Sequence, residues 1–465
     1  MLSKIFQNKV FKNFSYLTLG SVLSQVFSLL TILKITKILH PDDYGLYSFI
    51  IAQGTLIMTI ADLGIMMIVV RSIARDPERT NDLVYNGMLL RIFSIIGISA
   101  VYIAYNHFLG NLSGFEMAMV FLFALISCFG KIFETAFLGH QIMLPTAVIN
   151  FSSGLLWFSY VFLAPVELIQ ASYLVVAFLI LNVIKNLIYY FSLKKFNLLL
   201  GKVGDFWSSS KRLLKESWPY FALTLVAMPY TKFSNNFLDI NSSIDEVAFY
   251  NLSDKFTGPI SMVLDMALIA IFPNFSALWI TNKGKFKKTI QDNFKYFMLL
   301  GMVFCFLFTV FAMEILGFLF PASYLPAVFV CQIQIWVLFL NSVNSLMGTI
   351  LGSTDNEKKI LKIGIVNMLF STPIVYFGSY YGALGLSIAY LSATALFQFY
   401  IWYVFQKTIS IKIKDSFLMG GLAILLFLSS YFLLGEINIL FKILIAALVL
   451  LTSGWFSKNL MVKGS

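Results

Sequence analysis

The sequence has few charged residues, few cysteines and few histidines, and each shortage excludes a class of protein. Charged side chains make up 12% of the 465 residues, about half the share typical of soluble domains. The three cysteines, Cys128, Cys305 and Cys331, lie inside apolar runs and offer no disulfide framework. The three histidines are isolated and have no metal-ligand spacing. A soluble domain, a disulfide-stabilised secreted domain and a histidine metal centre are therefore excluded.

Catalytic and nucleotide-binding motifs are also missing. Each glycine–lysine pair, at 130–131, 201–202 and 284–285, is followed by an apolar residue, so the sequence contains no P-loop for ATP. The formal net charge of +11 belongs largely to the loops between apolar runs, which argues against a nucleic-acid surface. We therefore predict a protein that is not an enzyme, needs no cofactor or metal and does not bind nucleic acid.

Apolar residues are abundant and make up 59% of the chain. A helix needs about 20 residues to cross a bilayer, so the composition predicts an all-α, polytopic membrane protein. Apolar runs bounded by polar breaks predict fourteen spans. These spans are residues 12–39, 44–70, 83–107, 115–139, 145–164, 169–193, 217–239, 246–274, 289–313, 326–352, 360–379, 382–406, 416–434 and 437–456.

The charges of the loops predict the orientation of the chain in the membrane. One set of loops is rich in Lys and Arg, including the loop with Arg71, Arg75 and Arg79. The alternate loops, such as HPDD at 40–43, contain no Lys or Arg. Because short cytoplasmic loops are enriched in these cations, we predict that both termini are cytoplasmic. The longest cytoplasmic connection is interpreted as a linker with an amphipathic segment on anionic lipid.

An internal repeat relates the two halves of the chain. A shift of 203 positions aligns Lys9 with Arg212, Lys12 with Lys215, Asp42 with Asp245, Tyr47 with Tyr250 and Asp62 with Asp265. Because each half has six spans, both halves enter the membrane the same way up, which predicts a pseudo-two-fold axis along the membrane normal. We predict a six-helix lobe at 1–196, a cytoplasmic linker at 197–216, a second six-helix lobe at 217–407 and two extra helices with a tail at 408–465.

Basic residues inside the predicted spans divide into two groups. A cation at the centre of a span costs about 2.5–3.5 kcal/mol, but a lysine near a span end can extend its side chain to the interface. Extension to the interface explains five lysines: Lys37, Lys185, Lys295, Lys362 and Lys442. It fails for four deeper cations, Arg91, Lys131, Lys232 and Lys255. We expect these four to face a wet or protein-lined interior.

Polar stripes recur at helical spacing on the first, second, seventh and eighth spans. They include Gln25 and Lys34 on the first span, and Asn235 beside Asn236 on the seventh. Such stripes can simply join helices. Their occurrence on repeat-related spans favours a shared hydrophilic cavity.

Four acidic residues, Asp62, Glu134, Asp254 and Asp265, also lie within spans. Glu134 is three residues from Lys131, so we expect an ion pair on one helix face. Asp62 and Asp265 are repeat mates and allow two interpretations. They are candidates for coupling to protons or sodium ions, or they pair with cations such as Arg91 and Lys255.

Several residues near the N-terminus occur in a familiar arrangement. Tyr44-Gly45 follows the first span, Asp62-Leu63-Gly64 lies in the second and Arg71 marks its exit. With an amphipathic first helix and a six-plus-six plan, these features resemble the Wzx-type polysaccharide flippases. Those proteins belong to the multidrug/oligosaccharidyl-lipid/polysaccharide exporter superfamily. The two extra spans resemble capsule and other polysaccharide members, whereas many O-antigen flippases have twelve spans.

The resemblance implies a secondary transporter in the bacterial inner membrane. It would flip undecaprenyl-diphosphate-linked oligosaccharide units by alternating access, surrounded by membrane lipid and working with a polymerase and other polysaccharide-assembly proteins. The implied diphosphate ligands are Arg91, Lys131, Lys232, Lys255 and Lys34, and the implied sugar contacts are Gln25, Asn235 and Asn236. Two alternatives are a drug or cation exporter of the same superfamily and a membrane glycosyltransferase or polymerase.

Overall fold

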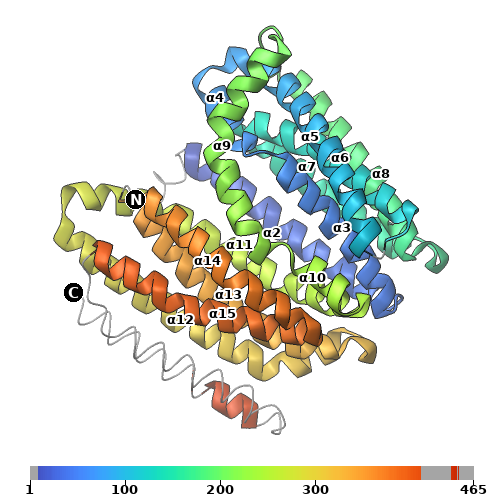
Figure 1. The fold of residues 1–465 in the computed structure, drawn as a ribbon, viewed down its shortest axis with the longest axis vertical. Helices are drawn as coiled ribbons and strands as arrows, with labels where there is room; N and C mark the ends of the chain where they lie inside the picture. The colour runs from blue at the N-terminus through green and yellow to red at the C-terminus, as the bar shows by residue number, and fades with distance from the viewer. Residues whose placement is uncertain (1–8, 111, 355, 410–440, 448, 450–465) are drawn as a thin grey trace. The chain divides into compact units, whose positions relative to one another are not determined.

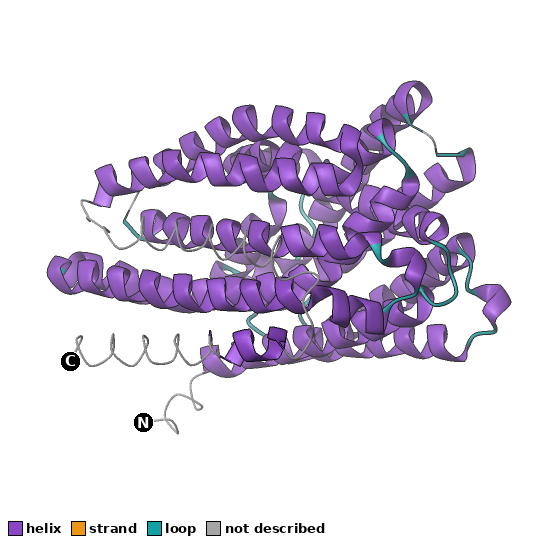
Figure 2. Cartoon of the chain, turned by 90° about the horizontal axis from the view of Figure 1, so that it is seen from below, coloured by secondary structure: helices purple, strands orange, loops and turns teal. Residues whose placement is uncertain are grey.

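The computed structural model describes residues 9–110, 112–354, 356–409, 441–447 and 449. Within these residues every regular element is a helix, as the cartoon in Figure 2 shows. The chain divides into two compact units, residues 1–248 and 249–465. Figure 1 identifies the helices of each unit by label and by colour along the chain.

In its described residues the first unit contains nine α-helices and the first turn of a tenth. They are α2 (Lys9–Ile35), α3 (Pro41–Ala61), α4 (Ile65–Arg75), α5 (Thr80–Leu109), α6 (Gly114–Gly139), α7 (Met143–Leu163), α8 (Ala171–Lys195), α9 (Phe206–Thr231) and α10 (Ser234–Asn241). Helix α6 is central and packs against α3, α4, α5 and α8, whereas α2 packs along α7. The N-terminus of α6 is fixed by a capping box between Ser113 and Glu116.

The second unit contains most of α11 (Ile244–Thr281), with α12 (Lys283–Leu319), α13 (Pro326–Gly352), α14 (Glu357–Gly378) and α15 (Gly382–Ile409). Helix α13 is the most buried candidate span and contacts α12, α14 and α15. Its Trp336 donates from Nε1 to the Thr309 hydroxyl of α12 at 2.9 Å. This pairing allows an indole to sit in an apolar core without leaving its N–H unsatisfied.

The predicted fold class is confirmed: the chain is an all-α, multi-pass membrane protein. Eight helical stretches in the described residues are long and apolar enough to cross a membrane. The first twelve predicted spans all coincide with helices. The thirteenth, 416–434, lies outside the described residues, and only 441–447 and 449 of the fourteenth are described, all of them helical.

Two predicted spans are broken rather than continuous. The second divides into α3 and α4 at residues 62–64, and the seventh divides into α9 and α10 at residues 232–233. Polar residues mark both breaks, with Asp62 at the first and Lys232 followed by Ser234 at the second, but the predicted spans were drawn through them. Two further helices are longer than predicted, because the lysine-rich segment between the eighth and ninth spans is itself helical. Only Asn282 separates α11 from α12, and its side chain accepts from the Lys285 amide at 2.9 Å.

Candidate functional site

A buried ion pair lies at the break in the second predicted span. Arg91 of α5 is 2% exposed and donates from Nη2 to Asp62, the C-cap residue of α3. The other carboxylate oxygen of Asp62 accepts from the Met66 amide of α4 at 3.4 Å. The Nε and Nη1 atoms of Arg91 have no hydrogen-bond partner among the described residues. Asp62 therefore joins three helices through one carboxylate.

The backbone at this break requires glycine. Leu63 and Gly64 both have positive φ, at 50° and 70°, a conformation that is unfavourable for residues with a side chain. A Cβ atom on Gly64 would lie 2.8 Å from the Ser217 carbonyl oxygen and the Phe221 amide nitrogen of α9. The Asp-Leu-Gly motif thus turns the chain from α3 into α4 while the backbone of α9 packs directly against the turn.

A second polar cluster lies between α6, α7 and α8. Lys131 and Glu134 form the expected ion pair on α6, with Nζ and Oε2 at 3.0 Å. Lys185 of α8 is within electrostatic range of both. Its Nζ lies 5.9 Å from the centre of the Tyr189 ring, and the Tyr189 hydroxyl donates to the Asn150 amide oxygen of α7 at 3.3 Å. Because Lys185 lies near the end of its predicted span, it was interpreted from the sequence as reaching the interface, and this cluster was not predicted.

A third group of polar residues connects α3 to α10. Gln53 and Asn236 exchange two amide hydrogen bonds of 3.1 Å, and both side chains are buried. The adjacent Asn235 is also buried. Asp239, one turn further along α10, is within electrostatic range of Tyr102 on α5. The structure therefore places Asn235 and Asn236 in an interior that is rich in amides. Gln53 was not considered in the sequence analysis, although a lone amide in an apolar helix indicates a buried polar contact.

The remaining predicted residues are distributed over both units. Lys232 is exposed at the turn between α9 and α10, and Lys34 and Gln25 are half-buried on α2. In the second unit, Lys255 of α11 is half-buried beside Asp254. Asp265 lies on α11, but its side chain is outside the described residues. No group of three or more His, Cys, Asp or Glu side chains gathers in the described part of the chain.

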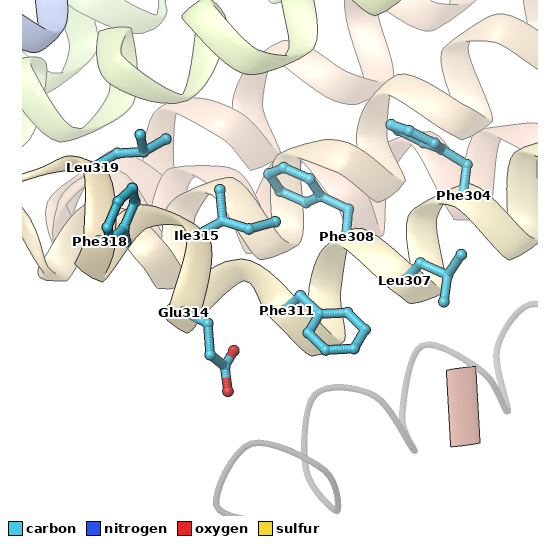
Figure 3. Close-up of a pocket in the computed structure, with 8 residues that line it drawn as sticks. All are labelled: Phe304, Leu307, Phe308, Phe311, Glu314, Ile315, Phe318 and Leu319. Carbon is cyan, nitrogen blue, oxygen red and sulfur yellow. The ribbon is translucent and has the colours of Figure 1, made fainter. Parts of the chain in front are cut away.

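The interpretation of Lys442 as a lysine that reaches the interface is wrong. Its side chain is 2% exposed, and Nζ lies 2.6 Å from Oε1 of Glu314 on α12. Glu314 is the single polar residue of an otherwise apolar groove of about 620 Å³ along α12. Figure 3 shows the eight lining side chains, with Glu314 and Phe311 on one side of the helix. Lys442 can be buried because the carboxylate of Glu314, 128 residues away in sequence, compensates its charge.

Residues 197–216, the predicted cytoplasmic linker, contact α5 and run into α9. Asp82 of α5 accepts from the Gly204 amide at 2.9 Å and from the Ser209 hydroxyl at 3.0 Å, and residues 206–216 already belong to α9. His140, which follows α6, lies 2.9 Å from the Thr80 hydroxyl. Burial lowers the pKa of His140 below its ordinary value, although a hydrogen bond to the Leu198 backbone opposes this shift.

The turns before α3 and α11, which the loop charges predict to be extracytoplasmic, lie together within the first unit. Gly45 is packed against the Ile244 backbone, where an added Cβ would collide. Burial, followed by the nearby Asp42 carboxylate, raises the pKa of Asp245 above its ordinary value, and His40 opposes that rise. These two aspartates are the residues that the 203-position shift aligns.

Comparison with known families identifies the chain. The model of a family described as polysaccharide biosynthesis protein matches residues 10–279, which is more than half of the sequence. The chain belongs to the polysaccharide biosynthesis protein family. The match covers residues 10–248 of the first unit, including the Arg91–Asp62 pair and the cluster around Lys131. Comparison with curated protein sequences gives no significant match.

Solved structures show the fold of this polysaccharide biosynthesis protein. The lipid II flippase MurJ in an inward closed conformation is similar with a TM-score of 0.72 and 15% identity, over 96% of this chain and 99% of MurJ. An inward-facing multidrug resistance MATE family transporter of the MOP superfamily has a TM-score of 0.65 and 12% identity, over 83% and 94%. The Vibrio cholerae MATE transporter VcmN gives 0.54 and 15%, over 88% and 98%. At these identities the likeness shows the fold alone, which is the one shared by MurJ and these MATE transporters.

Proposed function

We propose that this protein flips undecaprenyl-diphosphate-linked oligosaccharides across the bacterial inner membrane, with both termini in the cytoplasm. Membership of the polysaccharide biosynthesis family and a fold shared with a lipid II flippase support a lipid-linked glycan as the substrate. The observation that carries the proposal is that Lys131 remains 45% exposed eight residues before the C-terminal end of α6. An accessible cation at that depth suits an anionic headgroup rather than hydrocarbon.

The headgroup and the sugars call for different side chains. We assign the diphosphate to Lys131, Lys232, Lys255 and Arg91, with Lys34 as a further cation, because charge-assisted contacts replace the hydration of phosphate oxygens. The buried amides of Asn235 and Asn236, with Gln25, are assigned to sugar hydroxyls. Asp62 and Asp265 are the proposed coupling residues. For Asp62 this role implies competition, because a headgroup that engages Arg91 must replace the carboxylate that already binds it.

Transport in vesicles tests this proposal. Purified protein is reconstituted into liposomes that contain undecaprenyl-diphosphate oligosaccharide labelled on a sugar, and a membrane-impermeant quencher reports the label on the outer leaflet. Relative to protein-free vesicles, we expect the wild-type protein to enlarge the quenchable fraction with time. Lys255→Ala should slow this exchange and remove surface polysaccharide in cells, while the protein still reaches the membrane.

The rival functions predict other results. A drug or cation exporter would expel a cationic dye from the same vesicles and leave the labelled lipid in place. A glycosyltransferase or polymerase would change the mass of the lipid-linked glycan. Either result without lipid exchange would overturn the flippase proposal.

A further inference from the structure

Lys185 lies on the face of α8 that meets the rest of the first unit. Phe178, seven residues earlier on the same helical face, stacks on Phe123 of α6 with ring centres 6.0 Å apart and meets Trp157 of α7 at 5.1 Å. Tyr189, four residues later, bonds to α7. The exposed apolar side chains of α8 lie on other faces, as Leu187 and Phe191 do. Lys185 therefore points between α6 and α7 rather than toward lipid.

The charges around Lys185 do not balance. Lys131 and Lys185 share one nearby carboxylate, Glu134, and α7 carries no charged residue. By formal charge the cluster therefore carries one net positive charge. Lys131 lies eight residues before the end of α6 and Lys185 ten before the end of α8, which corresponds to about 12–15 Å along each helix. An uncompensated cation at that depth is costly unless water or an anion accompanies it.

We propose that Lys131 and Lys185 form a phosphate-binding subsite within the first unit. Glu134 is a positioning residue that holds Lys131 beside the site, and Asn150 and Tyr189 supply further polar groups. The ligand is a lipid that carries a phosphate or diphosphate headgroup. Its source is either the transported polyprenyl diphosphate, in which case the inference rests on the proposed function, or an anionic phospholipid of the bilayer.

Binding to the purified full-length protein in detergent micelles tests the subsite, with undecaprenyl diphosphate and phosphatidylglycerol as separate probes. Lys185→Ala should weaken binding of the preferred probe about tenfold, because one charge-assisted contact is lost. Lys185→Arg should restore most of the affinity and exclude misfolding as the cause. Lys195→Ala removes an exposed lysine from the end of the same helix and is the matched control, with no expected change.

The two probes separate the sources of the phosphate. Loss confined to undecaprenyl diphosphate supports a substrate subsite, and an equal loss for phosphatidylglycerol supports a phospholipid subsite. Wild-type affinity for both probes in Lys185→Ala and in the Lys131→Ala/Lys185→Ala double variant would overturn the inference. Vesicle transport keeps the two proposals distinguishable. If binding depends on the lysines but no lipid exchange occurs, only the flippase proposal is refuted. If lipid exchange occurs but binding does not depend on the lysines, only the proposed subsite is refuted.

Discussion

The Arg91–Asp62 pair makes a stability prediction whose size follows from its burial. Asp62→Asn removes the carboxylate and leaves a guanidinium that is 2% exposed without its ionic partner. Breaking a buried ion pair by removing one partner costs about 3–5 kcal/mol. Asp62 itself is 29% exposed, so the pair is not completely buried, and we expect the lower end, about 3 kcal/mol. That energy corresponds to about a hundredfold change in the unfolding equilibrium.

Removing both charges should be much milder than removing one. The double variant Asp62→Leu/Arg91→Met replaces the pair by apolar side chains, and such replacements are often neutral or stabilising. The matched control is Arg71→Gln, which breaks a pair with Glu216 at 2.9 Å whose side chains are 42% and 39% exposed. An exposed pair of that kind contributes about 0–1 kcal/mol.

Chemical denaturation in detergent micelles, followed by intrinsic fluorescence and checked for refolding, measures these differences. The expected order of stability places wild type, Arg71→Gln and the double apolar variant close together, with Asp62→Asn well below them. Two results would refute the reasoning: Asp62→Asn as stable as Arg71→Gln, or a double variant that is no more stable than Asp62→Asn.

Three other features predict measurable effects. Gly64→Ala should destabilise the protein by about 1–2 kcal/mol or more in the same denaturation assay, because its φ of 70° disfavours a side chain and α9 leaves no space for one. Gln53→Ala and Asn236→Ala should each cost about 1–3 kcal/mol and be less than additive together, because either change leaves the same buried amide pair broken. For His140, the lowered pKa means that the folded state binds fewer protons than the unfolded state. Thermal stability should therefore fall as the pH drops below about 6.5, and His140→Asn should flatten that dependence; equal profiles would contradict it.

The ion pairs show how far sequence reasoning reaches. Lys131 and Glu134 are three residues apart, and helix geometry alone predicted their pairing. Asp62 and Arg91 are 29 residues apart, and their pairing was one of two interpretations. The Glu314–Lys442 pair joins residues 128 apart and was not predicted. Predictability falls with separation because distant pairs depend on how helices pack, which hydropathy does not report.

The same reason explains which parts of the fold were missed. Apolar runs predicted the existence of the helices, because hydrophobic composition and length suffice for that. The break after Asp62 depends on a left-handed Leu63-Gly64 turn and on the close approach of α9. The docking of the linker depends on Asp82. Both features are local backbone geometries held by distant residues, and a scale of hydrophobicity carries no information about them.

Depth within the predicted spans and the exposed fraction of the side chain identify different cations. In the sequence analysis, Arg91 and Lys131 were grouped because both lie deep in a predicted span, and Lys185 and Lys442 because both lie near a span end. The exposed fractions of the side chains group these cations differently. Arg91 and Lys442 are both 2% exposed and are held by Asp62 and Glu314, so each joins helices that are distant in sequence. Lys131 is 45% exposed although Glu134 pairs with it. An exposed cation can meet a headgroup without first breaking the fold, whereas Arg91 must first exchange its carboxylate partner. We therefore expect Lys131 to govern binding of the headgroup and Arg91 to govern the movement of α3 and α4.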